Sequence, residues 1–67
     1  MSVAKVIELS SESTESFEHA IQVGVAKAAE TVKNIKAAWV DGQEVKVSGN
    51  QVTTYQVHLK ITFVVSD

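Results

Sequence analysis

Trp39 is the only tryptophan in the chain, and it is the side chain best suited to stack on a planar molecule. Stacked aromatic rings gain about 0.5–1.5 kcal/mol beyond the burial of their surface. Tryptophan is also enriched in contacts between protein subunits, and it can simply cover the sheet to which it belongs. The sequence therefore leaves three interpretations of Trp39 open: a ligand platform, a subunit contact, or a residue that packs on its own sheet.

Further polar groups lie in the C-terminal segment, where Gln56, His58 and Lys60 alternate with apolar residues. Alternate side chains along a strand point to one face, so these three would lie together. His58 could line a pocket there, and Lys60 with Lys46 could neutralise a ligand phosphate. The plainer alternatives are a surface histidine and lysines that only aid solubility. His19 falls in the predicted helix, so the two histidines do not form a spaced ligand motif.

A divalent cation would need oxygen ligands from the acidic side chains. Calcium takes six to eight such oxygens, yet these acids form no loop motif of the D-x-D-x-D-G kind. A calcium or magnesium site would have to be built across several subunits, and a solvated acidic surface is the alternative. The candidate ligands are Glu12, Glu15, Glu18, Asp41, Glu44 and Asp67.

Catalytic motifs are missing from the sequence. It contains no cysteine, no recognisable Ser-His-Asp set and no carboxylates fixed at a useful spacing. Its three glycines form no loop that could cradle a phosphate. We therefore predict that the protein is not an enzyme.

The length and charge of the chain restrict its partners. With 67 residues it is one domain, residues 1–67, and such a small domain is marginally stable by itself. The absence of cysteine leaves oligomerisation as the expected source of added stability. A net charge of −2 without any arginine argues against nucleic-acid binding. No apolar run is long enough to span a membrane, and we expect a cytoplasmic protein.

The elements that must position these groups follow the order strand, helix, strand, strand. β-branched residues favour a first strand over Val3–Ser10. Ser13 or Thr14 is the expected N-cap of the helix. Gly24 interrupts the apolar stripe of that helix, either because the backbone approaches the sheet closely or because the site tolerates glycine. The stripe recurs at steps of three and four and consists of Phe17, Ala20, Ile21, Gly24, Ala28, Val32 and Ile35.

The last two strands are predicted to form an antiparallel hairpin. A long, irregular strand runs through Ala38 and Val47, with a turn or bulge at Asp41-Gly42. Ser48-Gly49-Asn50 is the predicted hairpin turn. The residues from Tyr55 to Val65 then alternate between apolar and polar, and one short helix can cover only part of a strand that long. The fold class is α+β, a three-stranded antiparallel sheet partly wrapped around one helix.

With these elements the chain resembles the dodecin family over nearly its whole length, Val3 to Val65. The stretch "VIELSSESTESFEHAI" matches a Glu-Leu pair, a Ser/Thr-rich loop and a helix that starts Ser-x-x-Ser. The stretch "TYQVHLKITF" matches the family's Tyr-Gln-Val at Tyr55 and its late aromatic at Phe63. The resemblance implies a hollow homododecamer that sequesters flavin (riboflavin, FMN or FAD) in pairs at subunit contacts, for storage and without turnover.

The resemblance also places the flavin site. In flavin-binding members a tryptophan stacks on the isoalloxazine ring, and the glutamine that corresponds to Gln56 bonds its edge. The family's spacing, eighteen residues before Tyr55, puts that tryptophan at Ala37. If the strand is regular, Trp39 lies on the same face, displaced by about 6.5 Å. The resemblance thus implies Ala37 and Gln56, and Trp39 and His58 are added from residue type and strand parity, so the predicted cofactor-binding residues are Ala37, Trp39, Gln56 and His58.

A second branch of the family has a small residue in place of this tryptophan. Members of the calcium-binding type belong to it, and Ala37-Ala38 resembles them. The alternative to flavin sequestration is therefore a dodecin that binds calcium, or an assembly with a purely structural role.

Overall fold

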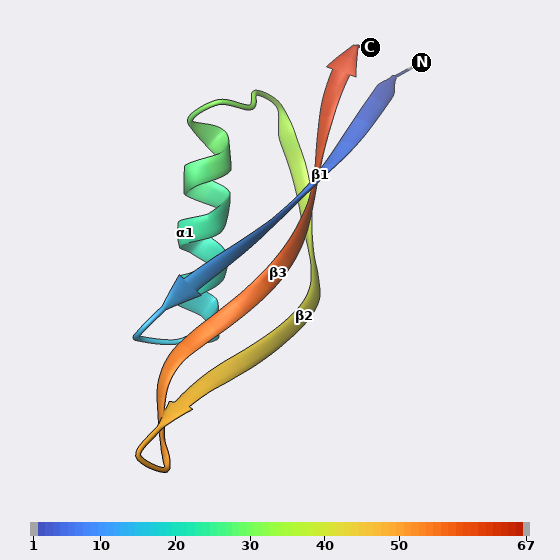
Figure 1. The fold of residues 1–67 in the computed structure, drawn as a ribbon. Helices are drawn as coiled ribbons and strands as arrows, with labels where there is room; N and C mark the ends of the chain where they lie inside the picture. Colours follow the sequence, from blue (N-terminus) through green and yellow to red (C-terminus); the bar gives the residue numbers. More distant parts are fainter. Residues whose placement is uncertain (1, 67) are drawn as a thin grey trace.

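A computed structural model describes residues 2–66 as one helix packed on one sheet (Figure 1). The elements are β1 (Val3–Ser13), α1 (Phe17–Ala29), β2 (Ile35–Ser48) and β3 (Gln51–Ser66). The sheet is antiparallel throughout, and its strand order is β1-β3-β2. The predicted β-α-β-β fold is confirmed, with the long C-terminal strand in the centre.

The core lies between α1 and the predicted apolar face of β3. Val57, Leu59 and Ile61 are fully buried there, and they pack with Ala20 and Ala28 of the helix. At the start of α1, the rings of Phe17 and Tyr55 meet edge to face with centroids 5.2 Å apart. Period-two burial along β3 therefore follows from its alternating sequence.

The prediction that Ser13 or Thr14 caps the helix is wrong, because β1 continues to Ser13 and the helix begins later. Ser13 pairs with Tyr55 of β3, and its hydroxyl accepts a hydrogen bond from the N–H of Glu15 at 2.9 Å. The N-cap is Ser16, whose hydroxyl accepts the N–H of His19 at 3.0 Å. The cap thus satisfies one of the free N–H groups in the first turn.

The expected apolar stripe is too long, because α1 ends at Ala29 and so excludes Val32 and Ile35. Asn34 adopts a left-handed conformation with φ 63°, which turns the chain into β2. Its carbonyl accepts the N–H of Val64 at 3.1 Å. Ile35 still packs against the core, but as the first residue of a strand. Val32 and Ile35 thus continue the helical spacing in the sequence, although both lie beyond the end of the helix.

Gly24 lies where the helix approaches the sheet most closely. A Cβ atom there would come within 2.9 Å of Leu59 Cδ1 and 3.0 Å of Ser11 Cβ. Of the two interpretations given above, close backbone approach is the one confirmed. The missing side chain lets α1 lie directly on β1 and β3.

The irregular course predicted for β2 is also confirmed. Its pairing with β3 shifts register at Ile35/Ala37, at Val40/Gly42 and at Lys46/Val47, so Asp41 occupies a bulge. The chain then reverses at Gly49 and Asn50, both with positive φ. Two left-handed residues in a two-residue hairpin are typical of a type I′ turn.

The sheet extends well beyond the helix at both ends (Figure 1). The described residues span 52 × 19 × 14 Å. Val45, Val47 and Val52 remain exposed towards the hairpin, and Val3 and Val65 at the opposite end. Among residues 2–66, no helix has both the length and the apolar character to cross a membrane.

Candidate binding face of the sheet

The predicted polar residues of β3 gather on the face of the sheet turned away from α1, which we call the binding face. It contains Gln56, His58, Lys60 and Thr62, together with their partners on the neighbouring strands. Directly paired residues point to the same side of an antiparallel sheet. The partners are Glu12, Ser10, Glu8 and Val6 on β1, and Glu44, Gly42, Trp39 and Ala37 on β2.

Trp39 stands out on the binding face. It pairs with Lys60, and its side chain is 70% exposed. From Ala37 to Val40 the pairing with β3 has no register shift. Trp39 and Ala37 therefore point to the same side, two residues or about 6.5 Å apart. Of the three interpretations, a residue that covers its own sheet does not account for this exposure.

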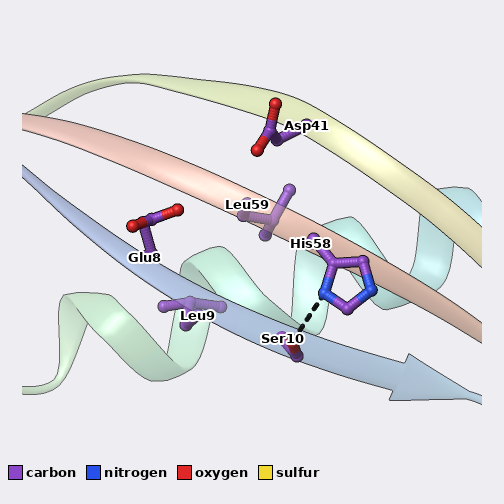
Figure 2. A pocket seen from close by; sticks show the side chains of 6 residues that line it. All are labelled: Glu8, Leu9, Ser10, Asp41, His58 and Leu59. Atoms are coloured by element: carbon purple, nitrogen blue, oxygen red, sulfur yellow. Dashed lines mark hydrogen bonds between the residues drawn. The ribbon is translucent and has the colours of Figure 1, made fainter.

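His58 forms the centre of a polar connection across all three strands. Its Nδ1 lies 2.8 Å from Ser10 Oγ on β1, and its Nε2 lies 3.1 Å from Glu44 Oε1 on β2. A carboxylate only accepts hydrogen bonds, so Nε2 carries the proton; in the neutral ring, the Ser10 hydroxyl then donates to Nδ1. Figure 2 shows His58 beside Ser10 on this face.

The two lysines of the binding face are each paired with an acid. Lys46 Nζ donates to Glu12 Oε1 at 2.6 Å, and Lys60 Nζ lies 3.7 Å from Asp41 Oδ2. The hydrogen bond to Glu12 and the charge of that carboxylate raise the pKa of Lys46 above 10.5. Each pair joins β2 to another strand. Both lysine charges are therefore already paired with a carboxylate of the sheet.

A shallow depression of about 300 Å³ lies between these groups (Figure 2). Glu8 and Asp41 stand on either side of β3, and the lining also includes Ser10, His58 and the two residues Leu9 and Leu59. The depression is small and polar, and it opens onto the same face as Trp39. One subunit thus offers a polar surface with a single large aromatic side chain.

The predicted metal ligands do not come together in one subunit. Within residues 2–66, no group of three or more His, Asp or Glu side chains is arranged to hold a metal ion. Glu12, Asp41 and Glu44 belong to the binding face or its bulge, whereas Glu15 and Glu18 lie at the start of α1. Glu15 instead approaches His19 at 3.4 Å. Asp67 lies outside the described residues.

Sequence reasoning placed Gln56, His58 and Lys60 correctly on one face but missed the partners of His58. Ser10 and Glu44 lie 48 and 14 residues away in the chain, and only the strand register brings them together. Glu8 was also missed, although it pairs directly with Lys60. The alternation of Glu8, Ser10 and Glu12 in β1 could have indicated that these residues share one face, but it does not indicate which residues of β3 they pair with.

Comparison with solved structures shows the same fold in bacterial dodecins. A single-residue variant of the T. thermophilus dodecin is similar with a TM-score of 0.93 and 30% identity, over 100% of both chains. The dodecin of Streptomyces davaonensis has a TM-score of 0.92 at 23% identity, over 98% of this chain and 97% of that one. The latter likeness is one of fold.

A third similar structure is described as a calcium-chelating immunodominant antigen, calcium dodecin, from Mycobacterium tuberculosis. It has a TM-score of 0.82 and 33% identity, over 91% of this chain and 87% of that one. None of the curated proteins compared with the chain matches it.

A family model also matches the chain directly. The model described as Dodecin covers residues 3–66, which includes every helix and strand of the fold. Dodecins are non-enzymatic binding proteins that typically form homododecamers, and family members bind flavin or calcium. By its family-model match, its fold and its strand order, this chain belongs to the dodecin family.

Proposed function

We propose that this protein assembles into a homododecamer and sequesters a flavin against Trp39, for storage and without turnover. The observation that supports this most is the 70% exposure of the only tryptophan on a sheet face outside the core. An indole ring so exposed gains by stacking on a planar ligand. The family's small-molecule binding makes a flavin the ligand class to test first.

The proposed site draws on Ala37, Trp39, Gln56 and His58, and one subunit cannot bring all of them to one ring. Trp39 pairs with Lys60. Gln56 lies four residues from Lys60, so the two are about 13 Å apart along β3. We therefore propose that the ring stacks on Trp39 of one subunit while Gln56 of a second copy bonds its edge. Such a site forms only in the assembled protein.

A fluorescence titration tests the proposal. Riboflavin fluorescence should be quenched on addition of the protein, because stacking on an indole shortens the lifetime of the excited flavin ring. The Trp39→Ala variant should bind at least about 5-fold more weakly, since stacking contributes about 1 kcal/mol. Val23→Ala, which shortens an exposed apolar residue on α1, is the matched control. Unquenched riboflavin with the wild-type protein would refute the proposal.

Calcium binding is the second candidate, and the similarity to a calcium dodecin at 33% identity favours it. Glu12, Asp41 and Glu44 place three carboxylates on or beside the binding face. Because one subunit does not gather them, ligands from neighbouring copies would have to complete the site. A ligand that binds only the folded state raises the melting temperature. Calcium should then raise it and a chelator should reverse the rise, whereas no shift would exclude this candidate.

A further inference from the structure

We infer that the binding face selects an uncharged flavin, such as riboflavin, over a flavin that carries a phosphate. This inference rests on the proposed function, because it concerns the ligand that stacks on Trp39. It follows from the charges that surround Trp39 and from the way the lysines of the face are engaged.

Two carboxylates lie in or next to the row of paired residues that contains Trp39. Glu8, Lys60 and Trp39 form one row across the three strands, since Lys60 pairs with both others. Asp41, two residues beyond Trp39, points to the same side and approaches Lys60 at 3.7 Å. Figure 2 shows Glu8 and Asp41 flanking β3 on either side of the depression. One ammonium group thus lies between two carboxylates.

The same excess of acid continues along the face. Glu12 and Glu44 both pair with Gln56, two rows along from Lys60. Glu44 accepts a hydrogen bond from His58, and Glu12 holds Lys46 at 2.6 Å. A third lysine, Lys36, lies at the separate register shift between Ile35 and Ala37. On the rest of the binding face and at the bulge of Asp41, four carboxylates stand beside two lysines, Lys46 and Lys60. Both ammonium groups are within 4 Å of a carboxylate, so a ligand phosphate would have to displace an acid to reach either of them.

A phosphate monoester would therefore meet a net repulsion on this face. It carries a charge of about −1.5 to −2 at neutral pH, and like charges repel over a range of about 8 Å at physiological ionic strength. The flavin ring itself is uncharged, and its stacking on Trp39 would be the same in both ligands. Riboflavin and FMN differ only by the phosphate, so their ratio of affinities isolates its effect.

The test measures the dissociation constants of riboflavin and FMN with the assembled protein at low salt. FMN should bind about 5- to 10-fold more weakly, as expected for one or two unit charges repelled through solvent. Added salt should strengthen FMN binding and leave riboflavin unchanged. The double variant Glu8→Gln, Asp41→Asn should bring the two affinities together. Glu30→Gln, which removes an acid beyond the end of α1, should leave the ratio unchanged.

The outcomes separate the two proposals. If neither flavin binds, the proposed function fails. If riboflavin binds and FMN binds equally well or better, the proposed function stands and the charge selection is overturned. An FMN preference that Lys36→Gln abolishes would locate the phosphate at the bulge where β2 begins, which also overturns it.

Discussion

Ala37 and Trp39 are the two residues of β2 that meet the planar ring under the proposed function. They share one side of the sheet because the pairing between the two bulges is regular. Alternation in the sequence was enough to predict this relation, since regular strand geometry fixes it. The partners of His58 could not be predicted, because Ser10 and Glu44 reach it only through the register of three strands.

Replacing Ala37 by tryptophan should strengthen flavin binding. A second indole on the binding face adds a stacking surface worth about 0.5–1.5 kcal/mol, or about 2- to 12-fold in affinity. The measurement is a riboflavin titration. The control is Ala38→Trp, which adds the same ring on the other face of the sheet, where Ala38 pairs with Ile61. An unchanged affinity in Ala37→Trp, with intact assembly, would show that no ring reaches position 37.

At the scale of the elements, the contact at Gly24 determines how closely α1 packs on the sheet. Gly24 faces Leu59 and Ser11 so closely that any Cβ would overlap them. The sequence offered close approach as one of two explanations, and it could not decide between them because the register of helix on sheet is a tertiary property. The N-cap of α1 was predicted wrongly for a similar reason, since the length of β1 determines where the helix begins.

Gly24→Ala should destabilise the protein by about 1–2 kcal/mol. Overpacking a close contact costs about 1–3 kcal/mol, which outweighs a gain of up to about 1 kcal/mol in helix propensity. Thermal or urea unfolding measures the difference. Gly42→Ala is the matched control, because its Cβ would meet only His58 Cδ2 at an ordinary 3.6 Å. A stabilised Gly24→Ala variant would mean that α1 can shift away from the sheet.

The two edge strands are joined across β3 by the ion pair between Lys46 and Glu12, and this pair gives stability a dependence on alkaline pH. The raised pKa of Lys46 means that folding stabilises its charged form. The contribution is therefore fully present below about pH 10.5, the ordinary pKa of lysine, and is lost as pH rises through the raised value.

The stability difference between the wild type and Lys46→Gln should accordingly be steady below about pH 9 and shrink as the pH rises beyond 10.5. Urea unfolding across this range provides the measurement. Lys33→Gln, in the connection between α1 and β2, controls for the loss of a positive charge alone. A difference that persists unchanged at the alkaline end would show that Lys46 stabilises through its aliphatic stem.

At the scale of the whole molecule, the helix and the sheet are unequal in length. A 13-residue helix is about 20 Å long, whereas a 16-residue strand reaches about 53 Å. Exposed valines at both ends of the sheet are the result. The sequence predicted this imbalance from the length of its alternating segment. It could not predict which surfaces meet, since that depends on how the sheet twists.

The purified protein should therefore elute as an assembly of about 86 kDa, twelve times the 7.2 kDa of one chain. Light scattering after size-exclusion chromatography gives the mass. Replacing the paired valines Val47 and Val52 by aspartate should shift it to smaller species, because charge at a buried contact is costly. Thr53→Asp, which puts the same charge at the residue that follows Val52, is the control. A wild-type mass near 7 kDa would contradict the assembly.

The three register shifts of β2 have a consequence for aggregation. A free strand edge is a template on which further strands can be added without limit, as in fibrils. The pairing of β2 with β3 shifts register at Ile35/Ala37, Val40/Gly42 and Lys46/Val47. Because bulges bend a strand and increase its twist, the outer edge of β2 offers no long regular ladder. The irregularity that forms the bulge at Asp41 thus also makes β2 a poor template for open-ended growth, which favours closed assemblies over filaments.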